Sequence, residues 1–145
     1  PGANTGRAID PLPRRRKGGY DVELTQVAQR ATDLDRAAAF YADLLGEEPV
    51  ARFDPPGLLF FRLGATRLLL DRAAPSALLY LRVTGLQDKV DELRGRAVEV
   101  VTEPHQIFVH DDDSLGPAGH QEWQAFVRDS EGNVVGLVEM VAPSP

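Results

Sequence analysis

The same order of predicted elements occurs twice along this chain of 145 residues. A strand pattern over residues 22–32 leads into a helix pattern, and three short strand patterns follow up to residue 71. A second strand pattern begins at residue 78, and a helix pattern and three strand patterns again follow, up to residue 140. A repeat of this kind restricts the fold to two similar modules, each with one helix and one sheet.

An offset of 52 residues aligns the two passes. It places Arg30 on Arg82 and Thr32 on Thr84. These identities are few, but they agree with the repeated element order and favour a duplicated unit. We expect module one at 22–72 and module two at 77–140, together one domain at 22–140, with tails at 1–21 and 141–145.

Turn and capping residues separate the predicted elements. Asp33 is suited to the N-cap of the first helix and Gly46 to the position just after its end. The second helix is predicted at residues 86–96, and residues 104–121 read as a polar loop. The predicted strands cover residues 22–32, 49–53, 58–63, 66–71, 78–84, 98–103, 122–129 and 134–140.

Charge and composition limit the classes of partner. The net charge is −6, and a basic cluster, RRRK at residues 14–17, lies in a tail rich in proline and glycine. The acidic remainder argues against nucleic acid and suits a cationic ligand. The basic cluster leaves a nucleic-acid arm as the alternative to a solvated tail. No apolar run approaches the ~20 residues of a membrane span, and the absence of cysteine fits a cytoplasmic protein.

Two segments resemble a known family. The stretch QVAQRATDLDRAAAFYADLLG (26–46) resembles the opening strand and helix of the vicinal oxygen chelate superfamily, which includes glyoxalases, bleomycin resistance proteins and dioxygenases. The stretch WQAFVRDSEGNVVGLVE (123–139) resembles its closing hairpin. The resemblance implies an α+β fold in which two βαβββ modules form incomplete barrels around a ligand cup. It also implies a homodimer, since many members dimerise.

The resemblance assigns four positions to metal ligands in the metal-dependent members. In this chain they are Gln26, Leu69, Leu78 and Gly136, so the glycine stands where relatives place a glutamate. One neutral amide cannot hold a hard divalent cation, which needs several anionic or imidazole donors. We therefore expect no metal and no other cofactor.

Aromatic and histidine residues are the remaining candidates. Tyr80 shares a strand face with Leu78 by period-two alternation, and Trp123 offers a large stacking surface. Either ring has a structural alternative as a packed core residue. The EPH at 103–105 and the tryptophan resemble a subgroup of the superfamily, which adds His105. The predicted ligand-binding residues are Gln26, Leu69, Leu78, Tyr80, His105, Trp123 and Gly136.

Two further patterns are ambiguous from sequence. Phe60 and Phe61 point to opposite faces of one strand, so one faces the core and the other the cup. The histidines His105, His110 and His120 flank the acidic run DDD at 111–113. This segment could hold zinc or manganese, but its spacing fits no ligand motif and favours an exposed acidic loop.

These observations predict a small-molecule binder of the sequestering or resistance type, with an apolar and aromatic cup. The alternative is a glyoxalase-like enzyme, a lyase, epimerase or dioxygenase, with an unrecognised site. Such an enzyme needs a Lewis acid or an oxyanion stabiliser, and neither stands at the expected positions. A small regulatory domain is the third possibility.

Overall fold

The computed structural model of the protein describes residues 23–145, so the predicted basic tail at 1–21 lies outside the described residues. Both modules have the predicted element order. Module one contains β1 (Gln26–Arg30), α1 (Leu34–Leu45), β2 (Ala51–Phe53), β3 (Leu58–Leu63) and β4 (Thr66–Asp71). Module two contains β5 (Leu79–Arg82), α2 (Leu86–Gly95), β6 (Val100–Val109), β7 (Gln121–Arg128) and β8 (Val134–Val141).

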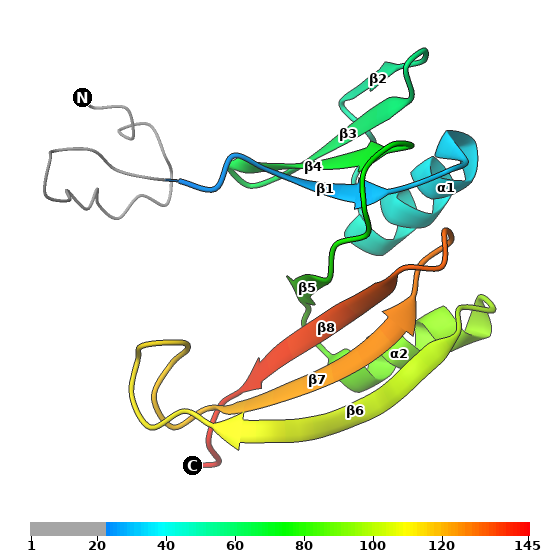
Figure 1. Ribbon diagram of the computed structural model, residues 1–145. Helices are drawn as coiled ribbons and strands as arrows, with labels where there is room; N and C mark the ends of the chain where they lie inside the picture. The colour runs from blue at the N-terminus through cyan, green and yellow to red at the C-terminus, as the bar shows by residue number, and fades with distance from the viewer. Residues whose placement is uncertain (1–22) are drawn as a thin grey trace, which may run out of the picture.

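Each module forms a four-stranded mixed sheet with the same strand order (Figure 1). Sheet one has the order β1-β4-β3-β2, and sheet two has the order β5-β8-β7-β6. In both sheets the first strand of the module pairs parallel with the last, and the other pairs are antiparallel. The fold is therefore α+β with two βαβββ modules, as predicted, and neither sheet closes into a barrel.

The two helices begin with different N-caps. Asp33 caps α1, since its carboxylate accepts a hydrogen bond from the Arg36 amide at 3.0 Å, and Gly46 ends the helix at a φ of 70°. At α2 the cap residue is Gly85, and the Glu139 carboxylate from β8 accepts the amides of Gly85 and Leu86 at 3.0 and 2.9 Å. Among residues 23–145 no helix is both long and apolar enough to cross a membrane.

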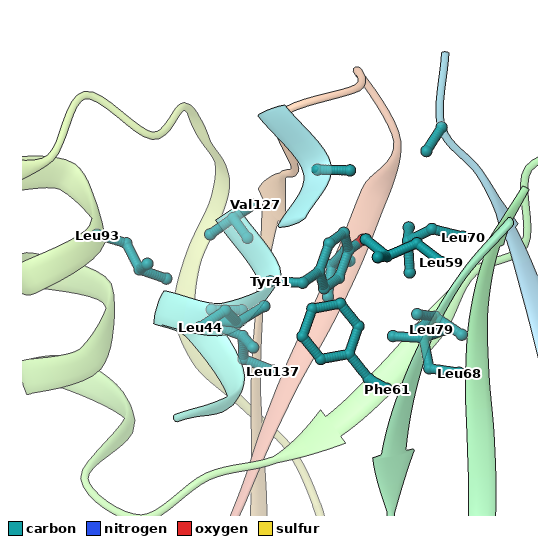
Figure 2. Packing of buried hydrophobic residues seen from close by; sticks show 14 of the residues in the cluster. Tyr41, Leu44, Leu59, Phe61, Leu68, Leu70, Leu79, Leu93, Val127 and Leu137 are labelled. Atoms are coloured by element: carbon teal, nitrogen blue, oxygen red, sulfur yellow. The ribbon is translucent and has the colours of Figure 1, made fainter. Parts of the chain in front are cut away.

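One hydrophobic core joins the two modules. Tyr41 and Leu44 of α1 lie among side chains from both sheets, including Phe61 of sheet one and Leu137 of sheet two (Figure 2). Phe61 is fully buried, so it is the core-facing member of the Phe60–Phe61 pair. Because both sheets direct their helix-side faces into this core, their opposite faces point away from it.

A buried hydrogen-bond network also ties the modules together, in the turn between β7 and β8. The carboxylate of Asp129 accepts the hydroxyl of Tyr41 at 2.6 Å and the backbone amide of Asn133 at 2.7 Å. The amide group of Asn133 donates to the carbonyl of Arg30 at 2.8 Å. The segment DSEGN at 129–133 therefore fastens module two to β1 and α1.

Glu131 in the same turn reaches the start of α1. Its carboxylate accepts the backbone amides of Thr32 and Asp33 at 2.9 and 3.0 Å. It also forms an ion pair with Arg36 at 2.7 Å. The side chain is 1% exposed, so this glutamate from module two completes the cap of the helix in module one.

Strand β6 is longer than the sequence predicts. Residues 104–109 belong to it, although the polar pattern of 104–121 predicts a loop. Proline is tolerated because β6 is the edge strand of sheet two and its pairing with β7 is irregular on both sides of Pro104. Sequence alone favours a loop here because Pro104 has no backbone N–H to donate.

Candidate functional site

The side chains of sheet one alternate between the core and an outer face. On β3, Leu59 and Phe61 are buried toward the core, and Phe60 points the other way. Strand register carries this alternation across the sheet. We call the set that faces away from the core the outer face of sheet one. It comprises Gln26, Ala28, Arg30, Ala51, Phe53, Leu58, Phe60, Arg62, Arg67, Leu69 and Asp71.

Gln26 and Leu69, two of the predicted site residues, both lie on the outer face of sheet one. The side-chain oxygen of Gln26 accepts a hydrogen bond from Nε of Arg67 at 2.8 Å. The Arg67 guanidinium also lies over the ring of Phe60, 5.9 Å from its centroid. Leu69 is the register partner of Phe60. The first predicted ligand position is therefore occupied by an amide–guanidinium pair above an aromatic ring.

The outer face of sheet two is defined in the same way by register. It comprises Tyr80, Arg82, Thr102, His105, Phe108, Glu122, Gln124, Phe126, Arg128, Val134, Gly136, Val138 and Met140. Leu78 immediately precedes β5, two residues before Tyr80, and is 51% exposed. Four of the predicted site residues, Leu78, Tyr80, His105 and Gly136, thus belong to this side of module two.

Gly136 leaves space for an aromatic pair. It is the register partner of Tyr80 on β5 and of Phe126 on β7. The two rings pack edge to face with centroids 5.8 Å apart. A Cβ at position 136 would stand 2.9 Å from Cδ2 of Tyr80 and 3.0 Å from Cε1 of Phe126. A side chain at position 136 would therefore force at least one of the two rings to move.

His105 lies on the same outer face, one row along from the aromatic pair. Its register partner on β7 is Gln124, and its Nδ1 lies 2.9 Å from the carbonyl oxygen of Glu103. The side chain is exposed. The structure therefore brings His105 to the face that carries Tyr80 and Gly136.

Trp123 does not share this face. On β7 it alternates with Gln124 and pairs with Glu139, which caps α2 on the helix side of sheet two. Tyr80 and Trp123 therefore lie on opposite faces of sheet two. Because Trp123 is an odd number of residues from Phe126, period two places the two rings on opposite sides.

Trp123 instead lines a separate pocket of about 230 Å³ near the start of α2. Its indole N–H donates to the side chain of Gln121 at 2.8 Å. The pocket is lined by Leu86, Gln87, Pro104, Gln121, Trp123, Glu139 and Val141. A ligand role for Trp123 in this pocket stays a prediction.

The histidine segment is buried at His110, although the sequence favours an exposed loop. His110 is 4% exposed, and its Nε2 lies 3.0 Å from the carboxylate of Glu122. Gly116 packs against it, since a Cβ there would stand 2.8 Å from the imidazole. Among residues 23–145 no group of three or more His, Cys, Asp or Glu side chains could hold a metal ion.

Two strongly shifted pKa values belong to the junction between the modules. Burial and the hydrogen bond to Asp129 raise the pKa of Tyr41 above its ordinary value. Burial alone would raise the pKa of Glu131, but hydrogen bonds from Arg36 and the Asp33 amide outweigh it and lower this pKa to about 2. Both groups stabilise the junction between the modules, and neither lies on an outer face.

Solved structures of other proteins share this arrangement over most of the chain. A member of the glyoxalase/bleomycin resistance protein/dioxygenase superfamily from Sphaerobacter thermophilus matches with a TM-score of 0.61 at 20% identity, covering 81% of this chain and 97% of that one. A lactoylglutathione lyase from Agrobacterium tumefaciens matches with a TM-score of 0.55 at 23% identity, covering 81% and 92%. The chain has the vicinal oxygen chelate fold.

The vicinal oxygen chelate fold does not by itself assign an activity. A virulence protein from Salmonella typhimurium also matches, with a TM-score of 0.60 at 17% identity over 84% of this chain and 99% of that one. No protein-family model and no curated protein sequence matches the chain. The function must therefore be argued from the side chains on the fold.

The metal that the vicinal oxygen chelate fold implies does not fit these side chains. Gln26 directs its only oxygen at the permanently charged guanidinium of Arg67. Leu69 and Leu78 offer no donor atom, and Gly136 is covered by the rings of Tyr80 and Phe126. A divalent cation at the first position would face a fixed positive charge and one neutral oxygen.

Two residues at these positions, Arg67 and Phe126, were not identified from the sequence, and Phe60 was named only as one of two candidates with Phe61. Arg67 stands two residues before Leu69 on one strand, and Phe126 lies directly across from Gly136. The alternation that places Arg67 beside Leu69 was available from sequence. The contact of Phe126 with Gly136 depends on the register of β7 with β8, which the sequence does not supply.

Proposed function

We propose that the protein binds a small organic molecule on the outer faces of its sheets, without a metal ion. The observation that carries this proposal is the replacement of the metal-ligand set by binding groups of another kind. Module one presents a guanidinium and an amide over Phe60, and module two presents the Tyr80–Phe126 pair. An apolar surface with a few orienting polar groups is typical of small-molecule sites.

A second copy of the chain completes the site in this proposal. The outer faces point away from the shared core, and several of their apolar side chains are open to solvent. Phe53 and Tyr80 are each 53% exposed, and Leu78 is 51% exposed. Exposed apolar and aromatic side chains of this kind, here on both outer faces, are typical of a binding surface. A homodimer that places one outer face against another would enclose the ligand.

Metal content tests the first half of this proposal. Elemental analysis of protein purified without chelator should show less than stoichiometric transition metal, and titration with Mn²⁺ or Zn²⁺ should give no binding that depends on Gln26. One stoichiometric ion that is lost in Gln26→Ala would overturn the proposal, because the residue would then be a ligand and not a partner of Arg67.

Binding of the neutral fluorescent dye Nile red tests the second half. We expect Tyr80→Ala and Phe60→Ala each to weaken binding by about 3- to 10-fold, since aromatic contacts contribute roughly 0.5–1.5 kcal/mol beyond burial. Leu115→Ala is the matched control, because Leu115 is 76% exposed but lies outside both outer faces. Loss of binding only in Trp123→Phe would move the site to the pocket beside α2 and contradict the proposal.

Sedimentation velocity tests the role of the second copy. The wild-type protein should sediment as a dimer at micromolar concentration, and Tyr80→Glu should shift it toward monomer, because the substitution places a charge on a face that dimerisation would bury. A wild-type monomer that still binds Nile red would contradict the enclosed cup and leave binding on a single open face.

A further inference from the structure

Two arginines stand directly opposite each other on the outer face of sheet one. Arg62 on β3 and Arg67 on β4 are register partners in an antiparallel pair. Side chains in this relation are separated at Cβ by roughly 5 Å, and like charges placed there are destabilising. Neither arginine forms an ion pair with any residue from 23 to 145. An anionic group bound between the two guanidinium groups would relieve this repulsion.

The charge of this face is opposite to the charge of the whole protein. The outer face of sheet one carries Arg30, Arg62 and Arg67 against a single acidic residue, Asp71. The protein has a net charge of −6. The acidic composition that suggested a cationic ligand therefore does not describe this face, which has an excess of fixed positive charge.

Arg67 is held in a defined position for binding. Its Nε donates to Gln26 at 2.8 Å, and its guanidinium lies over the ring of Phe60. These contacts use the Nε of the Arg67 guanidinium and one of its planar faces, and they leave its two terminal nitrogens to donate hydrogen bonds to a ligand. Guanidinium groups bind carboxylates through paired hydrogen bonds, and a group already fixed in place loses less freedom on binding.

An apolar row lies next to the arginines on the same face. Phe60, Leu69 and Ala28 are register partners across three strands, two residues along from Arg62, Arg67 and Gln26. Neighbouring rows on one face of a sheet are roughly 7 Å apart. A carboxylate attached directly to a ring system of one or two rings would span the two rows.

We propose that Arg62 and Arg67 together bind the carboxylate of an aromatic or otherwise apolar organic acid, whose body packs on Phe60 beside the mostly buried Leu69. The inference rests on the proposed small-molecule function and names the ligand class for the site in module one. In this assignment the positive charge that relatives obtain from a metal ion is supplied by two side chains of the protein.

Three probes that share a naphthalene ring and differ in the charge of its substituent test the assignment by calorimetry at low ionic strength: 2-naphthoate, neutral 2-naphthamide and cationic 2-naphthylmethylammonium. The full chain should bind naphthoate about 10- to 100-fold more tightly than naphthamide, because charged hydrogen bonds are the stronger ones. Arg62→Gln should remove at least about 10-fold of this preference. Arg52→Gln is the control, because Arg52 is exposed on the same sheet but pairs with Asp35 at 2.7 Å on the helix side.

Thermal unfolding supplies a second measurement. Without ligand, Arg62→Gln should raise Tm by about 1–4 °C, because it relieves the repulsion of Arg67. With saturating naphthoate, the wild-type Tm should rise and that of the variant should rise much less. A variant that is merely misfolded would lower Tm in both conditions.

Other results would overturn the inference. Equal binding of naphthoate and naphthamide, unaffected by Arg62→Gln, would reject the arginine site but leave the proposed small-molecule function standing. Failure of all three probes to bind, together with failure of Nile red, would reject both. Dissociation of the dimer by Arg62→Gln at unchanged naphthoate affinity would assign the arginines to contacts between copies.

Discussion

The two modules have the same topology but present different chemistry at their predicted site positions. In sheet one the position on the first strand is Gln26, bound to Arg67 above Phe60. In sheet two the position on the last strand is Gly136, beneath Tyr80 and Phe126. The outer face of sheet one therefore presents positive charge beside an aromatic ring. The outer face of sheet two presents two aromatic rings packed over a glycine. A duplicated backbone fixes where side chains point, but not what they bind.

The helices of the two modules also differ in which module supplies the residue that caps them. Each has a glutamate from the closing hairpin at its N-terminus. Glu139 caps α2 within its own module, but Glu131 crosses from module two to cap α1. Module one therefore depends on module two for the start of its helix, and α2 has no corresponding dependence on module one.

The largest expected effect is that of Asp129→Ala, which disrupts the turn that holds Glu131 against module one. The substitution removes the acceptor of the buried Tyr41 hydroxyl and of the amides of Glu131 and Asn133. We expect the free energy of unfolding to fall by about 3–5 kcal/mol, because buried donors are left without partners. Denaturant unfolding, followed by circular dichroism, measures this change.

A matched control is Asp43→Ala, which removes an exposed aspartate on α1 that pairs only with Arg96 among residues 23–145. Its effect should lie within about 0.5 kcal/mol, as for other surface ion pairs. Similar losses in the two variants would show that the junction at Asp129 contributes no more than an ordinary surface contact, against the dependence described above.

Next in size is the pH dependence that Glu131 confers on stability. Its pKa is lowered from 4.5 to about 2 in the folded protein, so its contribution is complete above about pH 4.5 and is lost as the pH falls toward 2. Glu131→Gln should cost about 2 kcal/mol at pH 7, less than the full shift implies because Arg36 is 53% exposed.

Thermal unfolding of wild type and Glu131→Gln between pH 2 and pH 7 makes the measurement. The difference in the free energy of unfolding should shrink across the acidic range and vanish near pH 2. A difference that stays constant over the whole range would mean that the charge of Glu131 is not what stabilises α1.

The smallest effect is expected from Gly136→Ala, which tests whether the rings of Tyr80 and Phe126 occupy the space over Gly136. The new methyl group meets Tyr80 at 2.9 Å and Phe126 at 3.0 Å. We expect a loss of about 1 kcal/mol, because Tyr80 is half exposed and can move aside. Removing the ring in Gly136→Ala/Tyr80→Ala should restore most of this loss relative to Tyr80→Ala alone.

Gly95→Ala is the control for the methyl group itself. Gly95 lies in α2, and no neighbouring atom stands within 4 Å of the place that a Cβ would occupy. Alanine there should therefore stabilise the protein by about 0.5–1 kcal/mol. If Gly136→Ala also stabilises, the rings do not require the glycine.

Local sequence patterns predicted those elements well whose bounds depend on neighbouring residues, such as turns and helix caps. The residues 58–63 and 66–71 form strands with the predicted bounds, and Asp33 and Gly46 cap α1 as expected. The predicted end of β6 was wrong because a proline usually interrupts pairing, and only its place at the sheet edge allows it. The sequence motif that suggested Trp123 does not say which face the residue occupies; strand parity and register place it on the helix side of sheet two.

The sequence by itself determined the duplicated βαβββ order and the parity of each strand, because these follow from residue type and spacing along the chain. That three of the four expected metal-donor positions hold leucine or glycine could be read from the sequence only through its resemblance to a known family. Only the tertiary structure decided that Arg67 faces Gln26 and Arg62, that Phe126 and Tyr80 cover Gly136, and that Glu131 caps a helix in the other module. Most of these contacts join strands or turns far apart in sequence, and their register is set by packing on the shared core.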